Sequence, residues 1–244
     1  MLAKKIAIFS DVHGNLPALE AAFTNMNTRG LQERYCLGDL VGYGTFPNEV
    51  IWLIQEHKVP TIKGNYDRSV SMDSYDCGCA YRTEEDKRLG EQSIRWTNKY
   101  TTVENKAYLR SLPEQLLVQL DDLKIMLVHG SPRKINEYLY EDRPDGTMER
   151  IMDGVDAYVL VCGHTHLSYH RALPSGRHIV NTGSLGKPKD GNPDACYAQL
   201  SAEKRGLNVE FVRILYDIES IARDIEATEG MPNVFAMNLR EGRG

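Results

Sequence analysis

Ile6-Ala7-Ile8-Phe9-Ser10-Asp11-Val12-His13-Gly14-Asn15 is the stretch from which the rest of the chain is interpreted. Its apolar half is typical of a buried strand, and it ends in a polar turn before a helix that begins near Leu16. Asp11 and His13 are two residues apart, so both project to the same side of an extended backbone. A carboxylate and an imidazole suit a borderline divalent cation, although an isolated Asp-x-His also fits an ordinary polar turn.

Metal-competent side chains follow the end of a predicted strand five times. The seven residues concerned are Asp11, His13, Asp39, Asn65, His129, His164 and His166. Glycine, serine or a tight turn accompanies each of them, which lets the backbone approach closely. A strand-end Asp or Asn is also a common turn former, and a single histidine is common on surfaces. Because ligands of an open α/β sheet gather outside the carboxyl ends of its strands, the seven together favour a metal centre.

The number and chemistry of these ligands predict two ions. If Asp39 bridges two metals, each metal receives four protein groups, and a shared carboxylate allows the short separation of two-metal sites. Nitrogen and oxygen donors without cysteine favour manganese, iron, zinc or cobalt over a structural thiolate site. We therefore expect two divalent metal ions as cofactors, with manganese favoured and iron, zinc, cobalt or nickel as alternatives.

Composition and charge restrict the class of protein. The 244 residues are 41% hydrophobic and 26% charged, which is enough for the core of one large α/β domain. A net charge of −5 gives no support for bulk nucleic-acid binding or for an anionic membrane surface. The apolar runs are too short for a membrane span or a signal peptide, so we expect a cytoplasmic protein. Self-association into a homo-oligomer stays open.

The five cysteines are an odd number, which argues against a disulfide framework. Cys36 and Cys162 lie in strand-like runs and are expected to be small buried hydrophobes. Cys77 and Cys79 form a close pair, for which a plain loop and a thiol role are both open interpretations. No CxxC motif or histidine cluster nearby in the sequence favours the thiol role.

The order of the predicted elements indicates an α/β fold. Strands at 6–9, 35–37 and 59–63 alternate with helices at 16–27 and 47–57, which implies parallel strands. Residues 68–112 interrupt this order with polar helices near 84–96 and 103–111, which we interpret as a helical cap within a single domain, 1–244. The remaining expectations are strands at 115–120, 123–128, 158–162, 168–173, 179–180, 195–200 and 207–215, and helices at 147–152, after Asp217 and beyond Pro232.

The motifs resemble the five signature blocks of the calcineurin-like metallophosphoesterases. They are Asp11-x-His13, Gly38-Asp39, Gly64-Asn65-x-Asp67, His129 in Val-His-Gly, and Gly163-His164-x-His166. The run 38–44 and Asn181-x-Gly183-Ser184 further resemble the small bacterial and archaeal phosphodiesterase branch. The resemblance implies a four-layer α/β/β/α sandwich of two mixed sheets with the metals at the strand ends. It also implies that one ion is held by Asp11, His13, Asp39 and His166 and the other by Asp39, Asn65, His129 and His164.

The third block departs from the family pattern, because Tyr66 stands where many members have histidine. That histidine is taken to donate to the leaving group or to stabilise the transition state. Tyrosine can donate a hydrogen bond, but with a pKa of about 10 it is a poor proton shuttle near neutrality. The departure argues against fast hydrolysis of phosphomonoesters or phosphoproteins.

We expect catalytic roles for Asp39, Asn65, Tyr66 and Asp67, with Asp67 orienting its neighbours, although an ordinary turn carboxylate is an equal interpretation of Asp67. Arg68 and Arg133 closely follow the blocks and could contact substrate phosphate, and Lys187 could do the same. Surface arginines and lysines are common, so a structural role is open for all three.

The sequence thus predicts a dinuclear metal-dependent phosphoesterase. It would hydrolyse phosphodiesters or nucleotide-type phosphate esters through a hydroxide that bridges the metals. Its partner would be a small phosphate-ester substrate, and neither the substrate itself nor the metal in the cell can be read from the sequence. A non-catalytic scaffold that keeps the fold is the alternative, favoured by Tyr66 and opposed by the complete ligand set. A phosphoprotein phosphatase is a third possibility.

Overall fold

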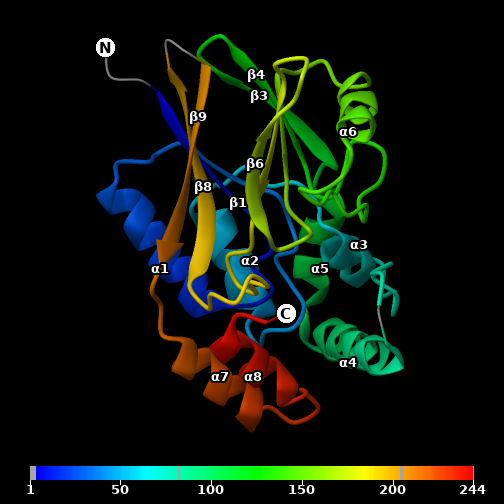
Figure 1. Ribbon diagram of the computed structural model, residues 1–244. Helices are drawn as coiled ribbons and strands as arrows, with labels where there is room; N and C mark the ends of the chain where they lie inside the picture. Colours follow the sequence, from blue (N-terminus) through cyan, green and yellow to red (C-terminus); the bar gives the residue numbers. More distant parts are fainter. Residues whose placement is uncertain (1–3, 82, 204–205, 244) are drawn as a thin grey trace.

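Two sheets face each other in the computed structural model, which describes residues 4–81, 83–203 and 206–243 (Figure 1). The first sheet has the order β2 (Arg34–Cys36), β1 (Lys5–Phe9), β8 (Ala195–Glu203) and β9 (Gly206–Ile214). The second has the order β3 (Gln115–Leu120), β4 (Leu123–Val128), β5 (Val159–Cys162), β7 (His178–Thr182) and β6 (Ser168–Ala172). Each combines parallel and antiparallel pairs, so the two predicted mixed sheets are confirmed.

The period of two along β1 explains how the first two layers form. Ile6 and Ile8 point into the core between the sheets, together with residues of β4, β5, β7 and β8. Ala7 and Phe9 point the other way, into a second core beneath two helices. These helices are α1 (Leu16–Thr28) and α2 (Pro47–Glu56).

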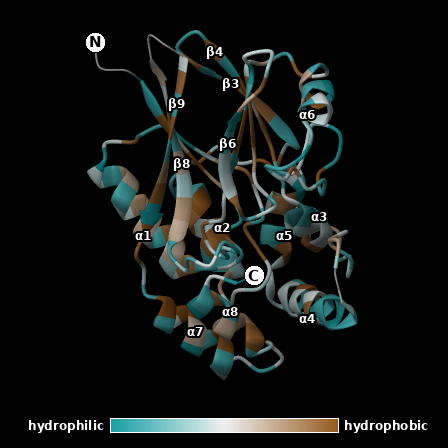
Figure 2. Cartoon of the chain, viewed as in Figure 1, coloured by the Kyte–Doolittle hydropathy of each residue, from teal (hydrophilic) through white to brown (hydrophobic). Residues whose placement is uncertain are grey.

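The second sheet has the same construction. Val159 and Val161 of β5 face the first sheet, whereas Leu160 and Cys162 face a cluster that includes helix α6 (Asp145–Met152). Brown residues recur in the strands between the helical layers in Figure 2, interspersed with paler and teal ones, whereas helix α4 is mostly teal and white. Both sheets thus bury two faces, and the predicted four-layer α/β/β/α sandwich is confirmed.

A helical insertion lies between α2 and β3 in the sequence. It contains α3 (Asn65–Ser71), α4 (Glu84–Tyr100) and α5 (Val103–Ser111). Thr83 and Asp86 cap the beginning of α4 reciprocally, and the Thr102 side chain caps α5. The two helices predicted here are therefore confirmed, with α4 four residues longer than predicted.

The predicted strand at 59–63 is wrong. Only Thr61 forms a bridge, to Cys36, although Ile62 N–H also donates to the Cys36 carbonyl. Pro60 has no N–H to donate, and Lys63 N–H turns away to the Pro113 carbonyl. The neighbouring strand β2 has the predicted three residues but is shifted by one, since it begins at Arg34 and ends at Cys36 rather than at Leu37.

The last part of the chain forms a helical hairpin, α7 (Ile218–Ala227) and α8 (Val234–Glu241). The Asp217 carboxylate accepts a hydrogen bond from Ser220 N–H at 3.0 Å, which confirms the predicted cap. Ile221 and Ile225 pack against Phe235 in a cluster of their own. None of the helices in the described part of the chain has the length and apolar character that crossing a membrane requires.

Candidate metal centre

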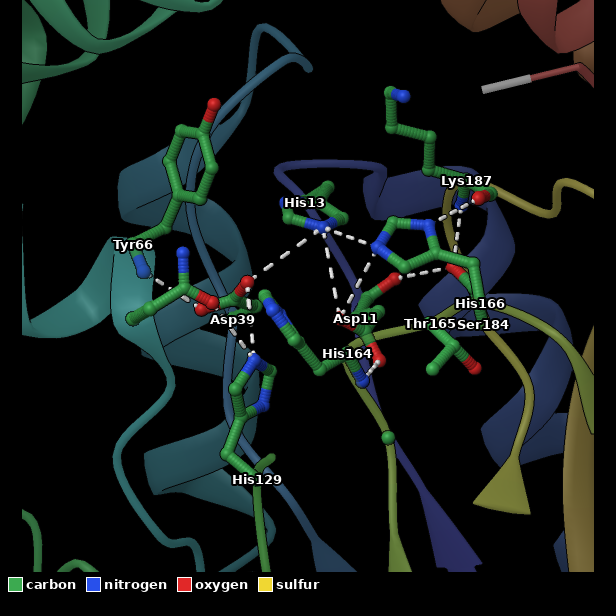
Figure 3. Close-up of polar contacts among 12 residues, drawn as sticks. Asp11, His13, Asp39, Tyr66, His129, His164, Thr165, His166, Ser184 and Lys187 are labelled. Carbon is green, nitrogen blue, oxygen red and sulfur yellow. Dashed lines mark hydrogen bonds and ion pairs between the residues drawn. The ribbon is translucent and has the colours of Figure 1, made fainter. Parts of the chain in front are cut away.

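The predicted ligands lie together where the parallel strands of both sheets end. Figure 3 shows the side chains of six of them converging on one region: Asp11, His13, Asp39, His129, His164 and His166. Asp11 and His13 follow β1, Asp39 follows β2, His129 follows β4, and His164 and His166 follow β5; Asn65 is the first residue of α3. All seven are buried. The topology therefore brings residues separated by up to 155 positions into contact, as the strand-end argument predicts.

Five of these ligands share an unusual backbone conformation. Their φ angles are +56° at Asp11, +49° at His13, +52° at Asp39, +65° at His164 and +62° at His166. The left-handed region is uncommon for residues other than glycine, although Asp and His enter it more readily than most. Such backbone strain concentrates at functional sites, where the surrounding fold maintains it.

Two glycines leave room for the carboxylates. A Cβ atom at Gly64 would lie 2.1 Å from Asp39 Oδ1, and one at Gly163 would lie 2.2 Å from Ser10 Oγ and 2.7 Å from Asp11 Oδ2. These separations are far below van der Waals contact. The glycine that precedes Asn65 and the one that precedes His164 are therefore required by the packing of the site.

The first cluster consists of Asp11, His13 and His166. His166 Nε2 lies 3.3 Å from Asp11 Oδ1 and 3.3 Å from His13 Nε2. His13 Nε2 lies 3.7 Å from the same carboxylate oxygen. Two ring nitrogens and a carboxylate oxygen thus surround one point, as the ligands of a cation do.

The second cluster consists of Asp39, His129 and His164. Asp39 Oδ2 lies 3.4 Å from His129 Nε2, within this cluster, and 3.8 Å from His13 Nε2, in the first cluster. One carboxylate oxygen therefore faces both groups of ligands. This is the position that a bridging carboxylate requires.

The tautomers of three histidines are set by backbone carbonyls. His13 Nδ1 lies 3.0 Å from the Val41 carbonyl, His129 Nδ1 2.8 Å from that of Leu37, and His166 Nδ1 2.5 Å from that of Lys187. Because a carbonyl only accepts, each Nδ1 carries a proton and donates it. The lone pair of each neutral ring is then on Nε2, the atom that points into the clusters.

The amide of Asn65 is oriented by the loop that follows α3. Its Nδ2 donates to the Cys77 carbonyl at 3.0 Å and contacts Cys79 Sγ at 3.3 Å. Its Oδ1 is thereby turned toward His129 Nε2, 3.0 Å away. Cys77 and Cys79 thus lie in a loop that contacts a predicted ligand.

Asp67 binds the backbone around Asp39 rather than entering the clusters. Its carboxylate accepts from the N–H groups of Asp39 at 2.8 Å, Leu40 at 2.9 Å and Gly64 at 2.9 Å. Burial, with a contribution from the Asp39 charge, raises the pKa of Asp67 to about 7. The side chain thereby fixes the turn that carries the shared carboxylate.

The chemistry of both clusters fits divalent cations. Within the described part of the chain, the buried atoms Asp11 Oδ1 and His164 Nε2 have no hydrogen-bond partner. His129 Nε2 and Asn65 Oδ1 face each other although neither carries a proton when the ring is neutral. Orphaned buried acceptors that point at one another repel unless a cation lies between them. The donor set of imidazole nitrogen and carboxylate oxygen is one that borderline divalent metals accept.

Protonation of the histidines follows the same electrostatics. Burial lowers the pKa of His13, His164 and His166, so these rings are neutral near pH 7. Burial also disfavours the charged form of His129, but the Asp39 carboxylate outweighs it and raises the pKa of His129 to about 9. A proton on this ring thus takes the place that a cation beside Asp39 would occupy.

A cavity of about 470 Å³ opens above the clusters. Its lining includes His13, Asp39, Asn65, His164 and His166 from the clusters and Tyr43, Tyr66, Tyr81, Tyr138, Tyr140, Phe235, Lys187 and Lys189 around them. Tyr66 is 1% exposed, and burial raises its pKa well above the usual value, so its hydroxyl stays protonated. Burial lowers the pKa of Lys187 well below its usual value.

The two arginines predicted for substrate binding lie outside the lining of this cavity. Arg68 forms an ion pair with Glu114, and Arg133 forms one with Glu137. About half of each side chain is exposed, 42% for Arg68 and 52% for Arg133. The basic residues that the structure places in the cavity wall instead are Lys187, Lys189 and Arg243.

Sequence reasoning missed several residues that shape the site. Tyr43, Tyr138 and Cys79 carry no metal-ligand pattern, and Phe235 comes from the last helix, far from every motif. Ser184 donates its hydroxyl to the Asp11 carbonyl at 2.8 Å. Ser184 and Tyr43 had a signal in the sequence, the Asn-x-Gly-Ser run and the run 38–44, whereas the positions of the others depend on tertiary packing.

Known proteins resemble this chain over most of its length. An uncharacterized protein of Methanocaldococcus jannaschii is 31% identical over an alignment of 241 residues, and the alignment covers 90% of each of the two chains. A metallophosphoesterase of Sphaerobacter thermophilus has a similar crystal structure, with a TM-score of 0.77, 29% identity and coverage of 98% of this chain and 99% of that one. A hypothetical protein of Pyrococcus horikoshii superposes with a TM-score of 0.82 at 27% identity, covering 98% of each chain.

The family model for the calcineurin-like phosphoesterase superfamily domain matches residues 5–205. This range contains all six residues of the two clusters, Asn65, and both sheets up to β8. The hairpin of α7 and α8, which supplies part of the cavity wall, lies beyond it. The fold, the buried clusters and this match agree: the chain belongs to the calcineurin-like phosphoesterase superfamily.

Proposed function

We propose that the protein is a dinuclear metal-dependent phosphoesterase that hydrolyses phosphodiesters or nucleotide-type phosphate esters. The observation that carries the proposal is the position of Asp39 Oδ2, which faces His129 Nε2 at 3.4 Å and His13 Nε2 at 3.8 Å. One carboxylate is thus shared by two buried ligand clusters at the bottom of a cavity. Membership of a phosphoesterase superfamily supports the same activity.

Each ion would be held by four protein groups. Asp11, His13, Asp39 and His166 would hold one, and Asp39, Asn65, His129 and His164 the other. When bound, the ions would supply a water with a lowered pKa and positive charge for the phosphoryl oxygens. Manganese is the metal we favour, because the donors are nitrogen and oxygen without thiolate.

The protein's own groups prepare this site. Backbone carbonyls hold three imidazoles with Nε2 inward, and Asp67 holds the turn of Asp39 through three N–H groups. Tyr66 lines the same cavity with a protonated hydroxyl, which can donate a hydrogen bond to an ester oxygen.

The cavity supports small organic phosphates as substrates. Its volume of about 470 Å³ lies in the range of small-molecule sites. Several aromatic side chains in its wall offer surfaces for an aryl group or a nucleobase. Tyrosine at position 66 favours a diester with a good leaving group, because a phenol with a raised pKa is a weak proton donor to a poor one.

Hydrolysis of bis(4-nitrophenyl) phosphate by the manganese-loaded protein tests this function. We expect Asp39→Asn to lose both hydrolysis, by 100-fold or more, and bound manganese, because the bridging charge is removed. Asp156→Asn is the matched control, since Asp156 is an exposed carboxylate paired with Lys124. Full activity of Asp39→Asn would refute the bridging role, and manganese binding by the wild type without hydrolysis of any phosphate ester would favour a scaffold.

A further inference from the structure

Lys187 lies beside the first cluster, and its backbone is tied to it. Its N–H donates to Ser184 Oγ at 2.8 Å, and Ser184 in turn donates to the Asp11 carbonyl at 2.8 Å. Its carbonyl accepts from His166 Nδ1 at 2.5 Å. These backbone hydrogen bonds therefore fix the main chain of Lys187 relative to Asp11 and His166, and they do not involve the Lys187 side chain.

The side chain extends from this anchor into the wall of the cavity. Lys187 is only 6% exposed, and its Nζ lies 4.2 Å from the centre of the Tyr43 ring. In the described ranges, Nζ forms no ion pair and no hydrogen bond. In Figure 3, Lys187 and Tyr66 extend from the ligand clusters toward the same side. A cation removed from water needs an anion or hydrogen-bond acceptors to compensate, and the aromatic face of Tyr43 supplies only part of this.

We propose that Lys187 Nζ binds an anionic oxygen of the substrate's phosphate group. The inference rests on the proposed function and adds to it a residue for which neither the family match nor the ligand set accounts. Lysine is a compact positive charge suited to phosphate. Tyr66 leaves the third block without the imidazole of many family members, so Lys187 supplies a positive charge near the phosphate from another loop.

Replacing only the side chain separates this role from a structural one. Lys187→Met keeps an unbranched stem that can pack against Tyr43, and it retains the backbone contacts with Ser184 and His166. Lys187→Arg keeps the charge. Lys99→Met is the matched control, because Lys99 Nζ lies over a tyrosine ring in the same way, 5.0 Å from the centre of Tyr100, but outside the cavity lining.

Binding of inorganic phosphate to the manganese-loaded proteins, measured by calorimetry, tests the proposal. We expect Lys187→Met to weaken phosphate binding about tenfold or more, which is the effect of removing one charged hydrogen bond. Lys187→Arg should retain most of the affinity, and Lys99→Met all of it. All variants should bind the same amount of manganese, and KM for bis(4-nitrophenyl) phosphate should rise in Lys187→Met.

Two results would overturn the proposal. One is equal phosphate affinity of Lys187→Met and wild type. The other is loss of manganese from Lys187→Met, which would make Lys187 a positioning residue for the metal ligands. If the wild type binds phosphate in a Lys187-dependent manner but hydrolyses no ester, the phosphoesterase activity fails while the phosphate contact stands.

Discussion

Five of the predicted metal ligands occupy backbone positions that most residues avoid. Asp11, His13, Asp39, His164 and His166 all have positive φ angles. Left-handed backbone at a non-glycine residue costs about 1–3 kcal/mol in general, and less for Asp and His. The hydrogen bonds and close glycines around these residues maintain the conformation. Each side chain thereby reaches the centre directly from the end of its strand.

The tyrosine at position 66 should limit the rate for substrates with poor leaving groups. Tyr66→His should raise kcat about tenfold or more for an alkyl phosphodiester, because an imidazole is a better proton donor to a poor leaving group than a buried phenol. The smaller ring fits the space in which Tyr66 now packs against Tyr43. Steady-state kinetics with alkyl and aryl diesters measures the effect. Tyr66→Phe with wild-type rates on both substrates would show that the hydroxyl has no chemical role.

His129 predicts how the metal-free protein responds to pH. Its pKa rises from 6.5 in the unfolded chain to about 9 in the fold, because the Asp39 charge outweighs burial. The stabilisation is complete below pH 6.5 and is lost as the pH rises through 9; its size is on the order of 3 kcal/mol. Urea unfolding of the EDTA-treated protein at pH 6.5 and 9 measures the loss. His129→Asn should lack this part of the pH dependence, and an unchanged slope in that variant would contradict the assignment.

The sequence predicted the ligands because their chemistry is local, but it could not predict their surroundings. Asp, Asn and His at predicted strand ends can be identified in the sequence, and the order of the strands in the sheets brings these ends together. Arg68 and Arg133 stand next to the motifs in sequence, yet their side chains turn to Glu114 and Glu137. The Cys79 contact with Asn65 depends on a loop path that no short pattern specifies.

Among the elements, amphipathic helices were predicted best and short strands worst. Helix α5 has the predicted bounds, because the Thr102 cap and the following polar-apolar period agree. The segment at 59–63 has strand-like residues, but Pro60 and the turn at Gly64 leave only one bridge. Helix α3 was missed, because its seven residues begin with the predicted ligand Asn65 and have no apolar period.

Gly64 precedes the first residue of α3 and allows a prediction about the start of this helix. Gly64→Ala would place a Cβ atom 2.1 Å from Asp39 Oδ1, so the carboxylate or the start of α3 must move. We expect a loss of about 1–3 kcal/mol of stability, typical of overpacking, and at least tenfold weaker manganese binding. Gly146→Ala in α6 is the control, since no atom lies closer than 3.7 Å to its added Cβ. Wild-type manganese affinity in Gly64→Ala would contradict the packing argument.

The whole molecule is a four-layer sandwich, which the resemblance of the motifs implied. Alternation along β1 and the continuous apolar run of β5 each require two buried faces, and facing sheets with helices outside satisfy both. The position of α7 and α8 beside the cavity could not be predicted. An amphipathic pattern indicates that one face of a helix is buried, but it does not indicate which part of the protein covers that face.

Metal removal should destabilise the whole fold. The clusters join residues that follow β1, β2, β4 and β5, so the ions would link the two sheets at one end. Ligands that bind only the folded state stabilise it by about 4 kcal/mol at 1,000 times Kd. We expect EDTA to lower Tm by several degrees and added manganese to restore it, as calorimetry would show. In Asp39→Asn the shift should be much smaller, and identical shifts in both proteins would place the bound metal elsewhere.

The family match ends at residue 205, whereas Phe235, Asn238 and Arg243 still line the cavity. The predicted metal ligands and part of the cavity wall thus come from separate stretches of the chain. Replacing Phe235, Asn238 or Arg243 would therefore reshape one side of the cavity and leave all seven predicted ligands in place. This side of the cavity can vary independently of the two clusters.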